Sequence, residues 1–119
     1  MDEEVWRPAV SSRFPDLVSD LRVSNLANLE NTKTKRKLSP CNRGSDGHLG
    51  IQRRGKDIFL HHLVAETFIG PRPNLMVIDH IDGKKLNNVA SNLQYLTNID
   101  NARKGRRNDT IHIGYSYWE

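Results

Sequence analysis

An aspartate, a histidine and several asparagines are concentrated between residues 77 and 101 of this 119-residue sequence. Asp79 and Asn101 offer a carboxylate and an amide oxygen, and hard divalent cations prefer such oxygen ligands. His80 follows Asp79 directly, and a neutral imidazole can accept a proton from water near physiological pH. A metal ion and a general base together are what phosphodiester hydrolysis needs. The same residues could instead only shape turns, and their spacing leaves both interpretations open.

Two short strands joined by a polar loop would have to position these groups. The apolar run 75–78 predicts a buried strand that runs into Asp79 and His80. Residues 93–96 predict a second short strand, and a loop rich in Asp, Gly, Lys and Asn covers 82–92. If the two strands pair, the aspartate and the histidine lie at a strand end.

A helix should follow the second strand. Thr97 and Asp100 resemble a capping box with Asp in place of the commoner Glu, so we expect the helix to begin near Thr97. Asn101 would then lie one turn into the helix. If this helix packs across the strands, Asp79 and Asn101 lie on facing elements, where they could hold one ion.

The preceding part of the chain predicts one more helix and two hairpins. Apolar residues at 60, 63, 64 and 68 form the stripe of a short amphipathic helix over 60–68. Alternating apolar and polar residues predict a hairpin over 21–30 and a second over 47–60, with Arg54-Gly55 in its turn. The sequence therefore predicts an α+β fold with small β-hairpins and few short helices.

Three segments now identify a family. The sequences LHHLVAETF (60–68), VIDHIDGKKLNN (77–88) and SNLQYLT (91–97), with Asn101, closely resemble HNH endonucleases of the His-Me finger superfamily. The nearest branch is the phage and intron homing type, which lacks structural zinc. The stretches VWRP (5–8) and RVSNLANL (22–29) are similar, more weakly, to the small module that often precedes these nucleases.

The resemblance implies a ββα-metal core in which Asp79 and Asn101 bind one Mg²⁺ or Mn²⁺ ion. It further implies that His80 is the general base and that Asn92 hydrogen-bonds near His80 and orients its ring. The chain would be a metal-dependent endonuclease of double-stranded DNA that leaves a 5′-phosphate and a 3′-hydroxyl. A nickase activity and an origin in a phage or mobile element fit this family.

The resemblance divides the chain into three parts and departs from the family pattern at two points. Residues 1–45 would be the DNA-binding module, 46–105 the nuclease core and 106–119 a basic tail. The family usually has His-Arg where this chain has His61-His62, and these histidines could either line the site or have packing or DNA-proximal roles without catalysis. Members also often place a glycine where Ala27 stands.

Positive charge predicts how DNA would be held. The net charge is +4, and residues 33–56 alone carry eight basic and one acidic side chain. Basic clusters favour phosphate backbones through counterion release. The expected DNA contacts are Arg53, Arg54 and Lys56 on the second hairpin, Lys84 and Lys85 in the loop, and Arg103, Lys104, Arg106 and Arg107 near the C-terminus.

Several other features are expected to have ordinary roles. Asp82 and Gly83 should shape the loop, because glycine supplies a turn conformation, and His48 and His112 should be surface residues. The single cysteine, Cys41, excludes an intrachain disulfide and a cysteine zinc cluster.

Composition excludes a membrane protein and leaves three rival functions. No apolar run exceeds four residues and the N-terminus is acidic, so we expect no membrane span, no signal peptide and a cytoplasmic location. Alternation over 111–118 predicts a strand that could form a homodimer or dock on its own core. The rivals to a DNA endonuclease are a catalytically decayed DNA-binding module, a ribonuclease of the same core, and purely structural turn chemistry.

Overall fold

The computed structural model describes residues 3–43 and 47–104, which form short strands around one central helix. The α+β class expected from the sequence is confirmed. Within these two ranges, no helix is long and apolar enough to cross a bilayer. The strands are β1 (Trp6–Pro8), β2 (Leu21–Ser24), β3 (Leu29–Asn31), β4 (Lys37–Leu38), β5 (Cys41–Asn42), β6 (Leu49–Arg53), β7 (Lys56–Phe59), β8 (Met76–His80) and β9 (Leu93–Thr97). The helices are α1 (Leu60–Phe68) and α2 (Asn98–Lys104), with 3-10 turns η1 (Pro15–Val18) and η2 (Ala90–Asn92).

The first sheet is antiparallel, with the order β1-β2-β3-β4. The β2–β3 pair confirms the first predicted hairpin, with Val23 opposite Leu29. Its turn contains Ala27 at φ 68°, a conformation that costs little only for glycine. This conformation explains in physical terms why a glycine would suit that position.

The second sheet has the order β5-β6-β7 and contains the second predicted hairpin. Arg54 and Gly55 form its turn with φ values of 48° and 76°, which is the signature of a type I′ turn. Gly50 on β6 lies so close to β7 that an added Cβ would be 2.6 Å from the Ile58 carbonyl oxygen. A side chain at this position would therefore push the two strands apart.

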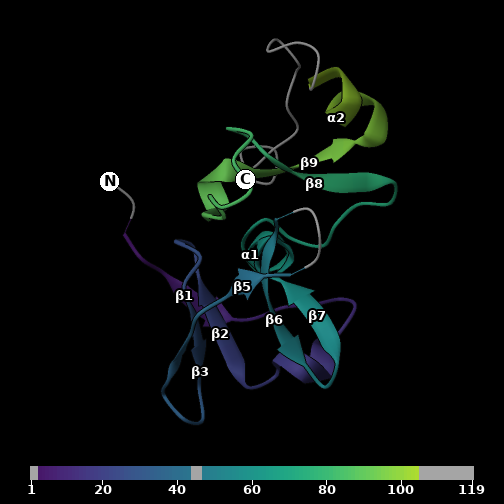
Figure 1. The fold of residues 1–119 in the computed structure, drawn as a ribbon. Coiled ribbons are helices and arrows are strands. Elements are labelled where there is room, and N and C mark those ends of the chain that lie inside the picture. Colours follow the sequence, from purple (N-terminus) through teal and green to yellow (C-terminus); the bar gives the residue numbers. More distant parts are fainter. Residues whose placement is uncertain (1–2, 44–46, 105–119) are drawn as a thin grey trace.

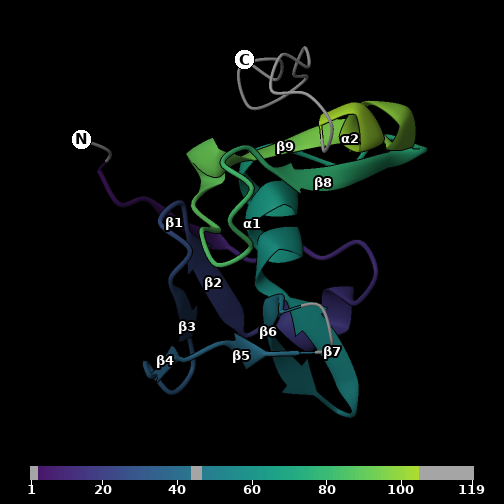
Figure 2. The ribbon, with the colours of Figure 1, turned by 45° about the horizontal axis from the view of Figure 1, so that its top comes forward.

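Helix α1 is the centre of the molecule and follows β7 directly. Figure 1 shows it end-on between the β8–β9 ribbon and the two larger sheets, and Figure 2 shows it from the side. Leu63 and Val64 are fully buried in a core to which both sheets and the ribbon contribute. Burying such side chains is the main driving force of the fold, at about 1.5–3 kcal/mol each.

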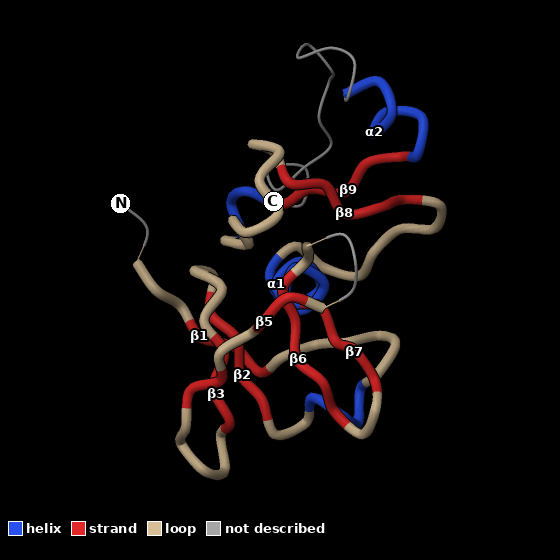
Figure 3. Tube along the Cα trace, in the orientation of Figure 1, coloured by secondary structure: helices blue, strands red, loops and turns tan. Residues whose placement is uncertain are grey.

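Strands β8 and β9 form an antiparallel ribbon that α2 covers, which gives the ββα arrangement expected from the sequence (Figure 3). The predicted helix start is confirmed, because the Asp100 backbone N–H donates to Thr97 Oγ1 at 3.1 Å. This bond satisfies one of the backbone donors that a helix N-terminus leaves open.

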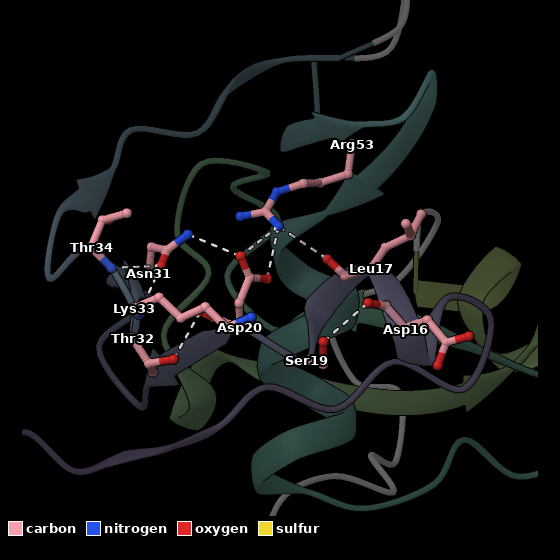
Figure 4. A network of polar contacts seen from close by, with 9 residues as sticks. All are labelled: Asp16, Leu17, Ser19, Asp20, Asn31, Thr32, Lys33, Thr34 and Arg53. Carbon is pink, nitrogen blue, oxygen red and sulfur yellow. Dashed lines mark hydrogen bonds and ion pairs between the residues drawn. The ribbon is translucent and has the colours of Figure 1, made fainter.

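An ion pair between the partly buried side chains of Asp20 and Arg53 links the N-terminal segment to β6 (Figure 4). Arg53 Nη1 lies 2.8 and 3.1 Å from the two carboxylate oxygens of Asp20 and 3.3 Å from the Leu17 carbonyl oxygen. Asn31 donates to the same carboxylate at 2.9 Å. Arg53, a predicted DNA contact, is thus paired with Asp20 within the protein, and its contact with DNA stays a prediction.

The division of the chain at residue 45 stays a prediction. Strand β5 lies before that boundary but pairs with β6 after it. Val18 and Leu21 from the N-terminal part share one core with α1. A boundary at residue 45 therefore divides both a sheet and a hydrophobic core.

Candidate active site

The end of the β8–β9 ribbon places the two central candidates on opposite faces. His80 is directly opposite Leu93, on the face that packs toward α1. Asp79 is opposite Gln94 on the other face, which α2 covers. The alternation of side chains along a strand requires this separation. A phosphate group at the ribbon's end would meet one side chain from each face.

The Asp79 carboxylate is held in place by its cross-strand neighbour. It is only 8% exposed, and Gln94 Nε2 donates to its Oδ2 at 2.7 Å. Gln94 itself is fully buried. A charged group with this little solvent needs hydrogen bonds or a cation to be stable, which is the environment of a metal ligand.

His80 is oriented by Asn88. The distance from His80 Nε2 to Asn88 Oδ1 is 2.7 Å, and Asn88 is 3% exposed. An amide oxygen only accepts hydrogen bonds, so Nε2 carries the proton and Nδ1 carries the lone pair of the neutral ring. The contact therefore fixes both the ring and its tautomer.

Two further histidines surround the His80 ring. The His48 ring centroid lies 5.7 Å from that of His80 at an interplanar angle of 24°, and the His61 centroid lies 5.4 Å away. His48 and His61 stack on each other at 4.4 Å. Burial, with smaller contributions from the charges of His62, His48 and His80, lowers the pKa of His61 to about 2. His61 is therefore neutral at physiological pH.

The loop between the strands is organised around Asp82. Its carboxylate accepts hydrogen bonds from the Lys84 backbone at 2.8 Å, from Asn87 Nδ2 at 2.8 Å and from Asn92 Nδ2 at 2.9 Å. These hydrogen bonds, with that of Asn87 the largest, lower the pKa of Asp82 to about 2. With Gly83 at φ 74°, the expected loop-shaping role of both residues is confirmed.

The Asn92 side chain contacts this loop, and the role expected for it beside His80 stays a prediction. Its Oδ1 accepts from the Asp82 backbone at 3.1 Å, and its Nδ2 also donates to the Asn87 carbonyl oxygen at 2.8 Å. Asn88, four residues earlier, makes the contact with His80. The two asparagines thus bond different partners: Asn92 bonds Asp82 within the loop, and Asn88 bonds His80.

The donor chemistry at the ribbon's end fits a hard divalent cation. Asp79 offers a carboxylate, and Asn101 is an exposed amide on α2, the helix that covers the Asp79 face. In the part of the chain that the structure describes, no three His, Cys, Asp or Glu side chains converge as a zinc site requires. The oxygen atoms of Asp79 and Asn101 suit a hard divalent cation in kind, and their role as its ligands stays a prediction.

Some of the remaining predicted site residues lie in the part of the chain that the structure describes, and others lie outside it. His61 contacts the His80 ring, while His62 lies next to His61 but faces a separate cleft. Four of the predicted DNA contacts are exposed: Arg54, Lys56, Lys84 and Lys85. Arg103 and Lys104 belong to α2, and their side chains lie outside the description, as do Arg106, Arg107 and the predicted strand over 111–118 with its homodimer.

Two site residues were not predicted from the sequence. His48 was expected at the surface, yet it is half-buried against the His80 ring. Asn88 lies in the segment VIDHIDGKKLNN, but the sequence alone predicts no role for it. The Asn87-Asn88 pair was a usable signal, since one of two adjacent amides in a short loop can point back toward the strand end.

Comparisons with known proteins agree with this geometry. Residues 59–103, from the end of β7 through most of α2, match the model of the HNH endonuclease family. An uncharacterized HNH endonuclease of Acanthamoeba polyphaga mimivirus is 34% identical over 115 residues, which cover 91% of this chain and 27% of that protein. The DNA endonuclease I-HmuI of Bacillus phage SP01 is 33% identical over 60 residues, covering 50% of this chain and 34% of that protein.

A solved structure has a similar fold over nearly the whole chain. The structure described as DNA binding and cleavage by the HNH homing endonuclease I-HmuI superposes with a TM-score of 0.70 and 26% sequence identity. The match covers 92% of this chain and 62% of that one. This chain therefore spans about a quarter to a third of the two curated relatives and less than two thirds of the solved chain.

Proposed function

This chain belongs to the HNH endonuclease family, and we propose that it hydrolyses phosphodiester bonds of double-stranded DNA with the help of a divalent metal ion. One observation carries the proposal: a buried histidine at a ribbon end, fixed in one tautomer by Asn88, adjoins a nearly buried carboxylate. A histidine with a purely structural role needs no lone pair at a defined ring nitrogen, whereas a general base needs one.

His80 would act as the base through Nδ1. This nitrogen takes a proton from a water molecule, and the water oxygen attacks the scissile phosphorus. The bond from phosphorus to the 3′ oxygen breaks, and that oxygen leaves with the bonding electron pair and takes a proton from solvent. The products are a 5′-phosphate and a 3′-hydroxyl.

Asp79 and Asn101 would hold Mg²⁺ or Mn²⁺. When bound, such an ion supplies Lewis-acid stabilisation of charge on the phosphate and on the leaving oxygen. Gln94 keeps the Asp79 carboxylate in place through its 2.7 Å hydrogen bond. Asn92 and Asp82 keep the loop closed, so that Asn88 stays against the His80 ring.

We further infer that one copy of the chain nicks one strand at a time and acts in the cytoplasm of a cell that carries a virus or mobile element. The part of the chain that the structure describes provides one such ribbon end, and one site serves one strand. The relatives from a phage and from a giant virus support the origin.

Supercoiled plasmid incubated with the protein and Mg²⁺ tests this function. We expect nicked circles from the wild type, and a rate about 10²- to 10⁴-fold lower for His80→Ala, which is the contribution of a general base. Lys33→Gln, an exposed change in the β3–β4 turn, is the control and should cut like the wild type.

Three results would contradict the proposal. Equal nicking by wild type and His80→Ala would remove His80 from its role. DNA binding without any cutting would indicate a decayed DNA-binding module. Faster cutting of RNA than of DNA in competition would indicate a ribonuclease.

A further inference from the structure

A polar cleft lies beside the candidate active site. It has a volume of about 80 Å³, which exceeds the roughly 10–15 Å³ needed to hold one water molecule. Its polar lining includes Arg13 from the segment after β1, His62 and Glu66 from α1, and Arg72 from the loop before β8. Nothing in the proposed hydrolysis uses these four side chains.

The two arginines keep their positive charge available. Among the residues that the structure describes, neither Arg13 nor Arg72 forms an ion pair with a carboxylate. Arg13 lies over the Phe14 ring at 5.2 Å, and Arg72 donates to the Met76 carbonyl oxygen at 3.4 Å. Both contacts position a guanidinium without neutralising it.

The two carboxylates of the cleft are already engaged. Asp57 is paired with Arg43 at 2.9 Å. Glu66 accepts hydrogen bonds from the Ser12 hydroxyl at 2.5 Å and from the Ser12 backbone at 3.3 and 3.4 Å. Among these described side chains, two unpaired guanidinium groups thus face one unpaired carboxylate, that of Glu66, which leaves the cleft with a net positive charge.

The cleft is close to the reacting groups. Ile78 lines it and lies on the same face of β8 as His80, two residues along the strand. His62 adjoins His61 on α1, with ring centroids 4.5 Å apart, and His61 contacts His80. A strand whose scissile phosphate lies at His80 would carry a neighbouring phosphate past this cleft.

We propose that Arg13 and Arg72, together with His62, bind a backbone phosphate of the DNA that flanks the phosphate to be cut. This inference rests on the proposed DNA endonuclease function. Arginine suits the task because its planar guanidinium donates two parallel hydrogen bonds to phosphate oxygens. The contact would position the strand without reading its sequence.

Salt-dependent binding tests the subsite without cleavage. All variants carry His80→Ala, so that a labelled duplex oligonucleotide stays intact while its Kd is measured between 50 and 200 mM salt. Arg13→Gln with Arg72→Gln should weaken binding about tenfold or more. It should also reduce the slope of log K against log salt by about 0.9, the value for one phosphate contact.

A matched control and a charge of opposite sign sharpen the test. The double variant Lys33→Gln with Lys35→Gln also removes two positive charges, but from the β3–β4 turn, which does not line the cleft. It should weaken DNA binding less than the arginine pair does. Glu66→Gln keeps an acceptor for Ser12 but removes a negative charge from the cleft, so binding should become several-fold tighter. A merely structural role would predict no gain.

The possible failures are distinguishable. If the arginine pair weakens binding no more than the lysine pair, or if Glu66→Gln also weakens it, the phosphate subsite is wrong while the proposed function stands. If the His80→Ala protein binds no DNA at all, the proposed function itself fails.

Discussion

His61 and His62 are neighbours on α1 but belong to two different regions of the molecule. His61 is 6% exposed, stacks on His48 and contacts the His80 ring, and burial lowers its pKa to about 2. His62 is half-buried and faces the cleft with Arg13 and Arg72. Burial lowers its pKa too, while the Glu66 carboxylate raises it.

Under the proposed function, α1 would support catalysis on the side of His61 and DNA binding on the side of His62. Successive residues point about 100° apart around a helix with 3.6 residues per turn. His61 therefore faces the ribbon's end, where groups must be fixed. His62 faces a cleft whose cations remain available to a ligand. Mutations in the two regions should separate turnover from affinity.

The largest effect that tests this separation is expected for Asn88→Ala. Loss of its acceptor oxygen frees the His80 ring and its tautomer, so we expect kcat to fall about 100-fold with Kd for DNA unchanged. Single-turnover cleavage and binding of the same duplex measure both quantities.

Asn88→Asp is the control for this prediction, because it keeps an oxygen acceptor at the same place and should recover much of the activity. A normal kcat in Asn88→Ala would break the comparison, since the ribbon's end would then tolerate a loosened histidine.

A second test uses the low pKa of His61. In the unfolded chain its pKa is about 6.5, against about 2 in the fold, so the unfolded state binds the proton between these values. Stability should thus fall as pH drops below about 6.5. Between pH 7.5 and 5.0 the loss from this one group is about 2 kcal/mol.

Urea unfolding of wild type and His61→Phe at the two pH values measures that loss, with chelator present in both series. The wild type should lose about 2 kcal/mol more than the variant on acidification. Equal losses would mean that His61 is protonated in the fold, and the contrast with His62 would disappear.

The sequence was sufficient for the parts of the fold that depend on neighbours in the chain. The stripe over residues 60–68 predicted α1, and alternation with a turn at Arg54-Gly55 predicted the β6–β7 hairpin. Thr97 predicted the start of α2. Each of these signals comes from local periodicity or capping, which a linear sequence contains directly.

Contacts between distant segments could not be predicted in the same way. Arg53 was expected to bind DNA because it lies in a basic block, but Asp20, 33 residues away, neutralises it. His48, which directly precedes β6, reaches His80 only because β6 packs against α1. Asn88 and Asn92 occupy the same polar loop, and the sequence does not say that Asn92 bonds Asp82 while Asn88 contacts the histidine.

Arg53 extends the comparison to cations and gives a smaller expected effect. Because its charge is paired and partly buried, Arg53→Gln should lower the free energy of unfolding by about 1–2 kcal/mol. The salt slope of DNA binding should not change, in contrast to the arginine pair of the cleft. A reduced salt slope of DNA binding, with no change in the free energy of unfolding, would instead indicate that Arg53 contacts DNA.

Ser12→Ala should give the smallest effect and tests how the cleft is built. The Ser12 hydroxyl and backbone tie the N-terminal segment to Glu66 on α1, and Arg13 follows directly. Removing the exposed hydroxyl should cost about 1 kcal/mol of stability, because the backbone bonds remain. Arg13 would then be held less firmly, so KM for DNA should rise about two- to threefold while kcat stays unchanged. A fall in kcat instead would mean that this segment supports the His80 region as well, and the two regions would no longer be separable.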